Sequence, residues 1–271
     1  MARTRVRIPA VPALLALSCG LALTLVTGCA ADDSPAAKPR DKAGADGPKV
    51  VVTTTWEGAF AKAAGAKDIE VIVPQSVHHA PDYDPKPSDL AAVAEADFVL
   101  YAPFEPYAEK IKEAAGSKGE LVEVALDNDP AKVKAEVARL ADKFGTSGEA
   151  AAWQKTFDTE YAALGKDLKS AWPEGKSPNV VSQVFTAWAA GMAGATTVGT
   201  FGPEAVTPGQ LKDLSAKKPA LVLDNAHMST GTVLPDSGAK QVPIVNYPGD
   251  DLDLLAVYRN AADALKKAMA S

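Results

Sequence analysis

The chain has 271 residues, enough for one large domain or two smaller ones. It carries 28 basic against 34 acidic side chains, a formal net charge of −6. This acidic balance argues against binding to nucleic acid and against electrostatic attachment to an anionic membrane surface. Of the two cysteines, Cys19 lies inside an apolar N-terminal stretch and Cys29 lies just beyond it. If that stretch is removed, no disulfide or thiolate metal site remains, and stability has to come from the core.

The N-terminus has the layout of a secretory signal. Three arginines precede an apolar stretch from about Val11 to Val26, and the first acidic residue is Asp32. The stretch ends in Val26-Thr27-Gly28-Cys29, which resembles the lipobox of bacterial lipoproteins. The resemblance implies that residues 1–28 are a signal peptide and that Cys29 is lipidated, which anchors the protein at the extracytoplasmic face of the cell membrane. An ordinary signal peptide with a chance cysteine, or an uncleaved anchor, is the alternative.

A tether is expected between the lipid and the first strand. Residues 29–48 are rich in Ala, Asp, Lys, Pro and Gly and have no aliphatic or aromatic side chain larger than Ala after Cys29. Such a segment cannot bury enough apolar surface to offset its ordering entropy. Without the three signal arginines, 25 basic residues face 34 acidic ones, so the processed chain has a charge of −9.

Residues 49–128 alternate between predicted strands and helices. Val50–Val52 is a buried strand, a short helix surrounds Phe60, and Ile69–Val73 is the second strand. A proline-rich loop over residues 74–87 leads to a helix that Ser88 is expected to cap and that runs to Glu95. A strand at Phe98–Tyr101, a helix near Ile111 and a strand at Leu121–Val124 follow. This alternation predicts a parallel sheet that helices cover on both faces.

Residues 129–172 are mostly helical. Asp129 and Pro130 are typical of an N-cap and first turn, and apolar side chains then recur at helical spacing. Gly145 interrupts the pattern, and Thr146 with Glu149 indicates a capping box for the continuation. At about 1.5 Å per residue the segment is far longer than a crossover helix needs to be. It is therefore predicted to link two lobes.

Residues 173–271 resume the alternation. Strands are predicted at Val180–Val184, Thr196–Val198, Leu221–Leu223 and Ile244–Val245, before a last amphipathic helix from about Leu252 to Met269. The predicted fold is thus α/β: two lobes with parallel sheets, joined by a long helix. A ligand in such a fold binds between the lobes, near the carboxyl ends of the strands.

The three histidines stand in the predicted loops of this cleft. His78 and His79 follow the second strand of the first lobe, and His227 follows a strand of the second lobe. Imidazole suits zinc, copper, nickel and iron. Two or three histidines with one carboxylate suit zinc, although loop histidines are often merely solvated.

At this point the sequence resembles the zinc/manganese-type substrate-binding lipoproteins of ABC importers. The most specific match is Asp82-Tyr83-Asp84-Pro85-Lys86-Pro87-Ser88-Asp89-Leu90, followed by the strand-like run at residues 96–101. The long connecting helix is also a trait of that family. The resemblance implies two α/β lobes with little hinge motion that capture a transition metal for a membrane permease.

The usual metal ligands of the family do not carry over to this chain. Its four ligand positions align with Pro81, Ala125, Gln183 and either Asn246 or the pair Asp250 and Asp251. A rearranged site is therefore expected, with His79 and His227 as the main ligands across the cleft. The candidate metal ligands are His79, His227, His78, Asp82 and Asp224, and further cleft candidates are Glu57, Gln183, Asn246 and Asp250. Asp224 is alternatively expected to orient a liganding histidine.

The function expected from these observations is capture of a zinc- or manganese-class ion and its delivery to an ABC permease, with zinc favoured. The alternative is the same fold binding an organic ligand or a metal chelate. An enzyme is not expected, because no nucleophile elbow is present and Asp224, His227 and Ser229 lie too close in sequence to form a triad readily. The protein is expected to act as a monomer.

The lipid anchor can be tested at Cys29. Only a cysteine at the cleavage site can form the lipid thioether, so Cys29→Ser is expected to abolish labelling with a lipid precursor and to release the protein from the membrane fraction or stall its processing. A processed lipoprotein carries at least two acyl chains, enough for stable attachment. Lipid labelling of the Cys29→Ser protein would refute the assignment.

Overall fold

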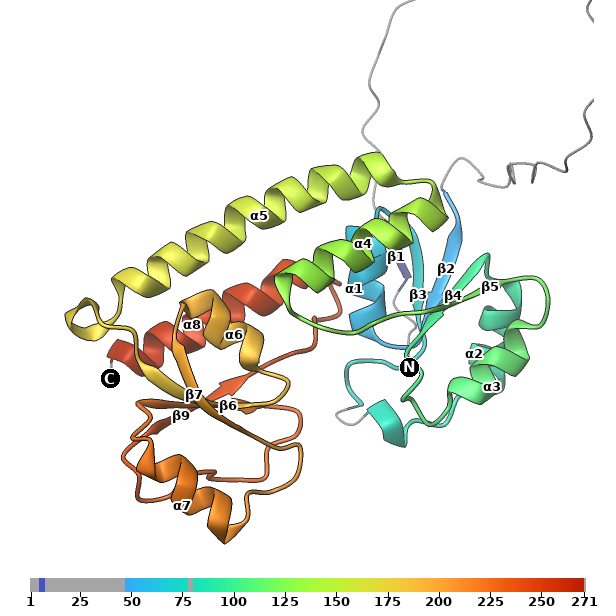
Figure 1. Cartoon of the computed structure of the whole chain (residues 1–271). Coiled ribbons are helices and arrows are strands. Elements are labelled where there is room, and N and C mark those ends of the chain that lie inside the picture. Colours follow the sequence, from blue (N-terminus) through green and yellow to red (C-terminus); the bar gives the residue numbers. More distant parts are fainter. Residues whose placement is uncertain (1–4, 8–46, 78–79, 271) are drawn as a thin grey trace, which may run out of the picture.

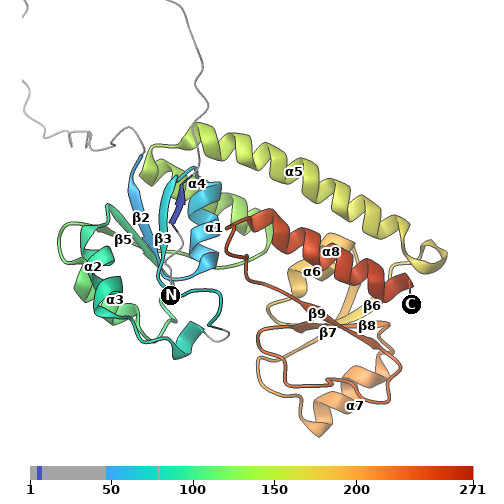
Figure 2. The ribbon, with the colours of Figure 1, turned by 180° about the vertical axis from the view of Figure 1, so that it is seen from behind.

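The computed structural model describes residues 5–7, 47–77 and 80–270. It has two lobes, each a sheet flanked by helices, and helix α5 (Ser147–Ser170) links them (Figures 1 and 2). The predicted fold class is therefore confirmed. Cys29, which is the predicted lipidation residue, most of the predicted signal and tether, and the two histidines His78 and His79 lie outside the described residues.

The elements follow the predicted alternation. The first lobe contains β1 (Arg5–Arg7), β2 (Lys49–Val52), α1 (Thr55–Ala63), β3 (Asp68–Val71), η1 (Ala80–Asp82), α2 (Pro87–Glu95), β4 (Phe98–Tyr101), α3 (Ala108–Ala115) and β5 (Glu120–Glu123). Helix α4 (Pro130–Phe144) precedes α5. The second lobe contains η2 (Pro173–Gly175), β6 (Asn179–Gln183), α6 (Ala187–Ala193), β7 (Thr196–Phe201), α7 (Pro208–Ala216), β8 (Leu221–Asn225), β9 (Lys240–Ile244) and α8 (Leu254–Ala270).

Both sheets are built around parallel strands. The first has the order β1-β3-β2-β4-β5, and the second has the order β7-β6-β8-β9. All pairs are parallel except that β1, which lies within the predicted signal peptide, runs antiparallel to β3. In the first sheet Val50 of β2 lies opposite Ile69 of β3 and Phe98 of β4. Loops that leave the carboxyl ends of β2 and β4 therefore start side by side.

Strand β2 is apolar because both faces of its sheet are covered. Val50 and Val52 are fully buried in the main core, whereas Val51 is fully buried in a separate cluster on the opposite face. Strands β7 and β9 are longer than predicted. They lie at the two edges of the second sheet and carry several exposed residues, so their polar positions weaken the apolar signal.

Two predicted helix caps are wrong. Helix α2 begins at Pro87, and its start is held by the Asp89 carboxylate, which accepts from the Lys86 N–H (2.8 Å), rather than by Ser88. The Thr146 hydroxyl does not cap α5. It donates instead to the carbonyl oxygen of Ala64 at the end of α1 (2.5 Å). This tertiary hydrogen bond replaces the helix cap that the local sequence predicts.

The helical stretch is interrupted where the sequence indicated. Helix α4 ends at Gly145, whose φ of 73° lies in the left-handed region that favours glycine. Helix α4 packs against α1 of the first lobe, and α5 turns back over α4 and continues to α6 and α8 of the second lobe (Figures 1 and 2). Helix α5 therefore spans both lobes.

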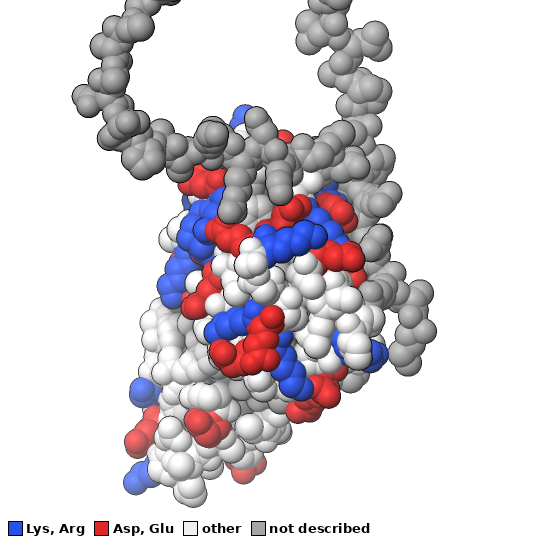
Figure 3. All heavy atoms as spheres, turned by 90° about the vertical axis from the view of Figure 1, so that its right-hand side faces the viewer, with Lys and Arg blue, Asp and Glu red and all other residues white. Residues whose placement is uncertain are grey.

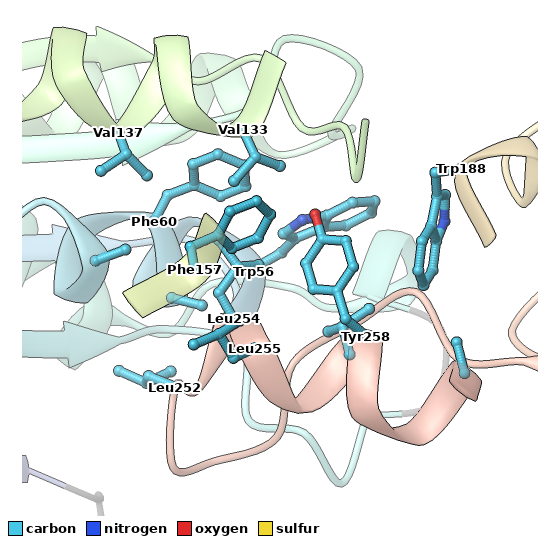
Figure 4. Packing of buried hydrophobic residues seen from close by; sticks show 14 of the residues in the cluster. Trp56, Phe60, Val133, Val137, Phe157, Trp188, Leu252, Leu254, Leu255 and Tyr258 are labelled. Carbon is cyan, nitrogen blue, oxygen red and sulfur yellow. The ribbon is translucent and has the colours of Figure 1, made fainter. Parts of the chain in front are cut away.

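A single apolar core runs through both lobes. It contains buried residues from β2 of the first sheet and from β6, β8 and β9 of the second. At its centre Tyr258 of α8 is fully buried, and its ring centroid lies 5.1 Å from those of Phe157 and Trp188 (Figure 4). The Tyr258 hydroxyl donates to the carbonyl oxygen of Asn128 (2.9 Å). Separating the lobes would expose this core to water, which the hydrophobic effect opposes.

The face of the first lobe in Figure 3 mixes positive and negative side chains. In the structure Lys110 pairs with Asp84 (2.6 Å), and Lys143 pairs with Glu120 (2.7 Å). No concentrated basic patch that would attract nucleic acid is visible on the described part of this face. A search of the described residues finds no helix with the length and apolar character needed to cross a membrane.

The shared core predicts a large cost for truncating Phe157. This side chain is fully buried on α5 and stacks on Tyr161 as well as meeting Tyr258. We expect Phe157→Ala to lower the free energy of unfolding by about 3–5 kcal/mol, measured by urea denaturation. Thr159→Ala, on the exposed side of the same helix, is the control and should change it by less than about 0.5 kcal/mol. A loss below about 1 kcal/mol for Phe157→Ala would contradict the shared core.

Candidate functional site

The two lobes meet at the carboxyl ends of their strands. The Thr55 hydroxyl at the start of α1 donates to the carbonyl oxygen of Pro248 in the second lobe (2.9 Å). The Asn128 side-chain amide donates to the carbonyl oxygen of Asn246 (3.1 Å). The ring of Trp56 lies edge-on to that of Tyr247, with centroids 4.8 Å apart. The predicted location of the site, between the lobes at the strand ends, is therefore a contact region in the structure.

Glu57 closes the turn between β2 and α1. Thr54 is the N-cap of α1, and the Glu57 carboxylate oxygen Oε2 accepts from the Thr54 N–H (3.1 Å) and from its hydroxyl. This reciprocal arrangement is a capping box, in which a glutamate three residues after a threonine satisfies the free N–H at the helix start. Helix capping therefore accounts for one of the two carboxylate oxygens of Glu57.

Glu105 repeats this arrangement after the neighbouring strand β4. Its Oε2 accepts from the N–H of Ala102 (3.1 Å), three residues earlier, and its Oε1 accepts from the hydroxyl of Tyr107 (3.1 Å). The sequence reasoning did not single out Glu105. The sequence nevertheless carries the same spacing at both places. Glu105 stands three positions after Ala102, just beyond the buried strand β4, as Glu57 stands three positions after Thr54, just beyond β2.

Both carboxyl groups are buried and influence each other. Glu57 is fully buried and Glu105 is 6% exposed. Burial, which disfavours the charged form, raises the pKa of Glu57. Burial first, and then the charge of Glu57, raises the pKa of Glu105 to about 8. No described Lys, Arg or His forms an ion pair with either group.

Aromatic side chains from both lobes surround this carboxyl pair. Burial, followed by the charges of Glu57 and Glu105, raises the pKa of Tyr247 to about 12, so a second-lobe phenol lies near both carboxyls. Burial and the same two charges also raise the pKa of Tyr107. The His227 ring lies 4.7 Å from the Tyr247 ring, centroid to centroid, in an edge-on contact.

The other predicted ligands are dispersed. Asp82 and Asp250 are exposed, and His227 is exposed and contacts Tyr247. Asp224 is buried, and its carboxylate accepts from Ser229 (2.5 Å) and from Gln241 (2.9 Å). Asp224 therefore contacts Ser229 directly. Within the described ranges no three His, Cys, Asp or Glu side chains gather around one point. The predicted site also includes His78 and His79, which lie outside these ranges, so it stays a prediction.

Two positions that align with family ligands hold neutral amides. The Asn246 oxygen Oδ1 accepts from the indole N–H of Trp188 (3.0 Å), and its Nδ2 donates to the carbonyl oxygen of Phe185 (3.1 Å). Gln183 is buried, its oxygen accepts from the Phe185 N–H (2.7 Å), and its Nε2 has no hydrogen-bond partner among the described residues. Asn246 is therefore fully engaged in holding the second-lobe wall of the interface.

Comparisons with known proteins agree with this architecture. A family model described as zinc-uptake complex component A, periplasmic, matches residues 50–149. A search of curated proteins finds no match.

Solved structures match over most of the chain. The laminin-binding protein Lbp of Streptococcus pyogenes has 18% identity and a TM-score of 0.59, over 83% of this chain and 99% of that one. The substrate-binding protein FpvC of P. aeruginosa in complex with Ni²⁺ has 16% identity and a TM-score of 0.61, over 82% and 96%. Zn(II)-bound AdcA of Streptococcus pneumoniae has 16% identity and a TM-score of 0.53, over 83% and 58%. At these identities the likeness establishes a shared fold. The resemblance that the sequence indicated is confirmed.

The raised pKa of Glu105 predicts how stability depends on pH. The folded pKa of about 8 exceeds the ordinary value of 4.5, so the folded state binds this proton more tightly than the unfolded chain. The resulting stabilisation is fully present below about pH 4.5 and is lost as the pH rises through about 8. We expect Glu105→Gln to remove this loss, which is at most about 1.4 kcal/mol per pH unit for one proton.

Urea unfolding of metal-free protein between pH 5 and pH 9 measures this effect. Asp84→Asn, which removes an exposed carboxylate of the same lobe, is the matched control and should keep the wild-type slope. Identical slopes in wild type and Glu105→Gln would show that Glu105 does not titrate in this range.

Proposed function

We propose that this protein is the extracytoplasmic substrate-binding component of an ABC importer and captures a divalent transition metal ion, with zinc favoured, for delivery to a permease. The observation that carries the proposal is the match of residues 50–149 to the zinc-uptake family model. The fold shared with Zn(II)-bound AdcA and with Ni²⁺-bound FpvC supports it over both lobes. Transport rather than catalysis also fits a site with no nucleophile in a catalytic setting.

Attachment at the membrane follows from the sequence. Val26-Thr27-Gly28-Cys29 supports lipidation at Cys29, and residues 30–48 supply a tether to the first strand. A lipid-anchored, monomeric receptor would stay close to its permease, which keeps the effective concentration of the captured ion high.

His227 is the proposed histidine ligand from the second lobe. It follows β8 and contacts Tyr247, which in turn contacts Trp56 of the first lobe, so it stands beside the interface of the lobes. The sequence places His79, and less directly His78, at the corresponding end of the first lobe. A metal bound by His79 and His227 would tie the lobes together and so mark the loaded state for the permease.

One observation favours a second candidate, capture of an organic ligand or a metal chelate. Exposed large apolar side chains follow β4, β6, β8 and β9 at their carboxyl ends: Phe104, Val184, Phe185, Met228 and Val245. Sites for organic ligands are lined mainly by such side chains, with a few polar groups that set orientation. In this alternative the buried amides and carboxyls would supply those polar groups.

Metal binding is expected to raise thermal stability and to be lost in acid. An ion that binds only the folded state stabilises it by mass action, and histidine coordinates in its neutral form. Binding of zinc should weaken as the pH falls through about 6.5. Elemental analysis after purification without chelators, and melting curves with zinc, nickel, copper or manganese, measure this. A melting temperature that no metal changes would favour the organic-ligand alternative.

The role of His227 is tested in the same assay. We expect His227→Ala to weaken zinc binding at least about tenfold in titration calorimetry, whereas the neighbouring exposed control Thr230→Ala binds normally. Normal binding by His227→Ala would place the ligands elsewhere.

A further inference from the structure

Two carboxyl groups without a basic partner meet at the ends of neighbouring strands. Glu57 follows β2 and Glu105 follows β4, and β2 and β4 are paired in the sheet. Val52 lies opposite Leu100, and the Thr53 N–H donates to the carbonyl oxygen of Leu100 (3.0 Å), so the turns that carry the two glutamates start side by side although they are far apart in sequence. Burial of two like charges is costly unless protons or a cation neutralise them.

Helix and turn capping explains only half of this arrangement. Oε2 of each glutamate accepts a backbone N–H, from Thr54 for Glu57 and from Ala102 for Glu105. The second oxygen of Glu57, Oε1, is fully buried and has no hydrogen-bond partner among the described residues. An unpaired buried polar atom costs about 1–3 kcal/mol. A cap that only served folding would not need this atom.

A separate side chain from the end of β2 is unpartnered in the same way. Thr53 is fully buried, and its hydroxyl makes no hydrogen bond of normal geometry within the described structure. The hydroxyl lies close enough to Glu57 and Glu105 to partly offset the effect of burial on the pKa of each. Thr53 Oγ1 and Glu57 Oε1 are thus two buried oxygens without a hydrogen-bond partner of normal geometry in the described structure, near the buried carboxyl group of Glu105.

We propose that Glu57, Glu105 and Thr53 form a binding site for a divalent metal ion that prefers oxygen ligands, such as Mn²⁺. Carboxylate and hydroxyl oxygens suit manganese, calcium and magnesium better than they suit zinc. The site is separate from the family-type positions at Pro81, Ala125, Gln183 and Asn246.

Binding of an ion at this site would affect the second lobe through Tyr247. The Tyr247 phenol senses the charges of Glu57 and Glu105, and its ring packs on Trp56 and His227. A bound dication would neutralise the two carboxylates beside Tyr247 and so remove their effect on its phenol. That the ion is the transported cargo rests on the proposed function, whereas the existence of the site does not.

The site is tested by titrating Mn²⁺ alone into the chelator-treated protein and following the loss of the free Mn²⁺ signal by electron paramagnetic resonance. Glu57→Gln and Glu105→Gln each remove a charged ligand but keep an oxygen that can accept the same backbone N–H, so folding is retained. Each is expected to raise the Kd for Mn²⁺ at least about tenfold. Asp84→Asn, which neutralises an exposed carboxylate, is the matched control and should leave the Kd unchanged.

Further readouts separate this site from the proposed function. Electron spin-echo measurements on bound Mn²⁺ should show no coupling to a histidine nitrogen, and such coupling would overturn the oxygen site. Unchanged Mn²⁺ binding in both glutamine variants, or no Mn²⁺ binding by wild type, would also overturn it. Zinc binding that depends on His227, together with Mn²⁺ binding that is unchanged in both glutamine variants, would leave the proposed function intact and refute this site. Mn²⁺ binding that depends on the glutamates, without metal uptake in cells, would keep the site and refute the transport function.

Discussion

Burial of Tyr258 where α5, α6 and the loop before α4 meet is the interaction on which the arrangement of the lobes depends. Its ring fills the space between Phe157 and Trp188, and its hydroxyl satisfies the carbonyl of Asn128 in the first-lobe loop. Apolar packing is dense and directional in such a core, so lobe rotation would leave voids or an unpaired carbonyl. The site between the lobes is thus built on a nearly fixed frame, and recognition has to rely on side chains and loops rather than on a wide hinge.

The packing of the lobes also explains why an amide, Asn246, stands at a position where the resembled family has a charged metal ligand. Trp188 donates to the Asn246 side chain, and Asn128 donates to its backbone carbonyl, so neutral hydrogen bonds tie the second lobe to the first. An aspartate at this position could accept from Trp188, but it could not donate to the carbonyl of Phe185 as the amide does. The amide therefore serves the interface, and negative charge is found in the first lobe instead, at Glu57 and Glu105.

Two carboxyl groups buried at the lobe contact lower the stability of the fold, so folding alone does not explain why they are there. Glu57 lies in the first turn of α1 and Glu105 in the turn that follows β4, and both are buried where apolar side chains would stabilise more. Groups with strongly perturbed pKa values concentrate at functional sites because binding or catalysis retains them against their effect on stability. The neighbouring rings of Tyr107 and Tyr247 exclude water and so strengthen any interaction that a cation would make there.

Local patterns in the sequence determined the alternation of strands and helices, the interruption at Gly145 and the placement of strand-end loops at a common cleft. These features depend on periodicity and backbone preferences over a few residues, so they are legible without a structure. The predicted capping roles of Ser88 and Thr146 are wrong. The Asp89 carboxylate, rather than Ser88, accepts the N–H at the start of α2, and the carbonyl oxygen of Ala64 accepts the Thr146 hydroxyl. Only the tertiary structure decided that Glu105 joins Glu57 while Asp224 bonds Ser229 and Gln241. The physical reason is that strand pairing and lobe packing bring together residues far apart in the chain, and no local period in the sequence records which of them will meet.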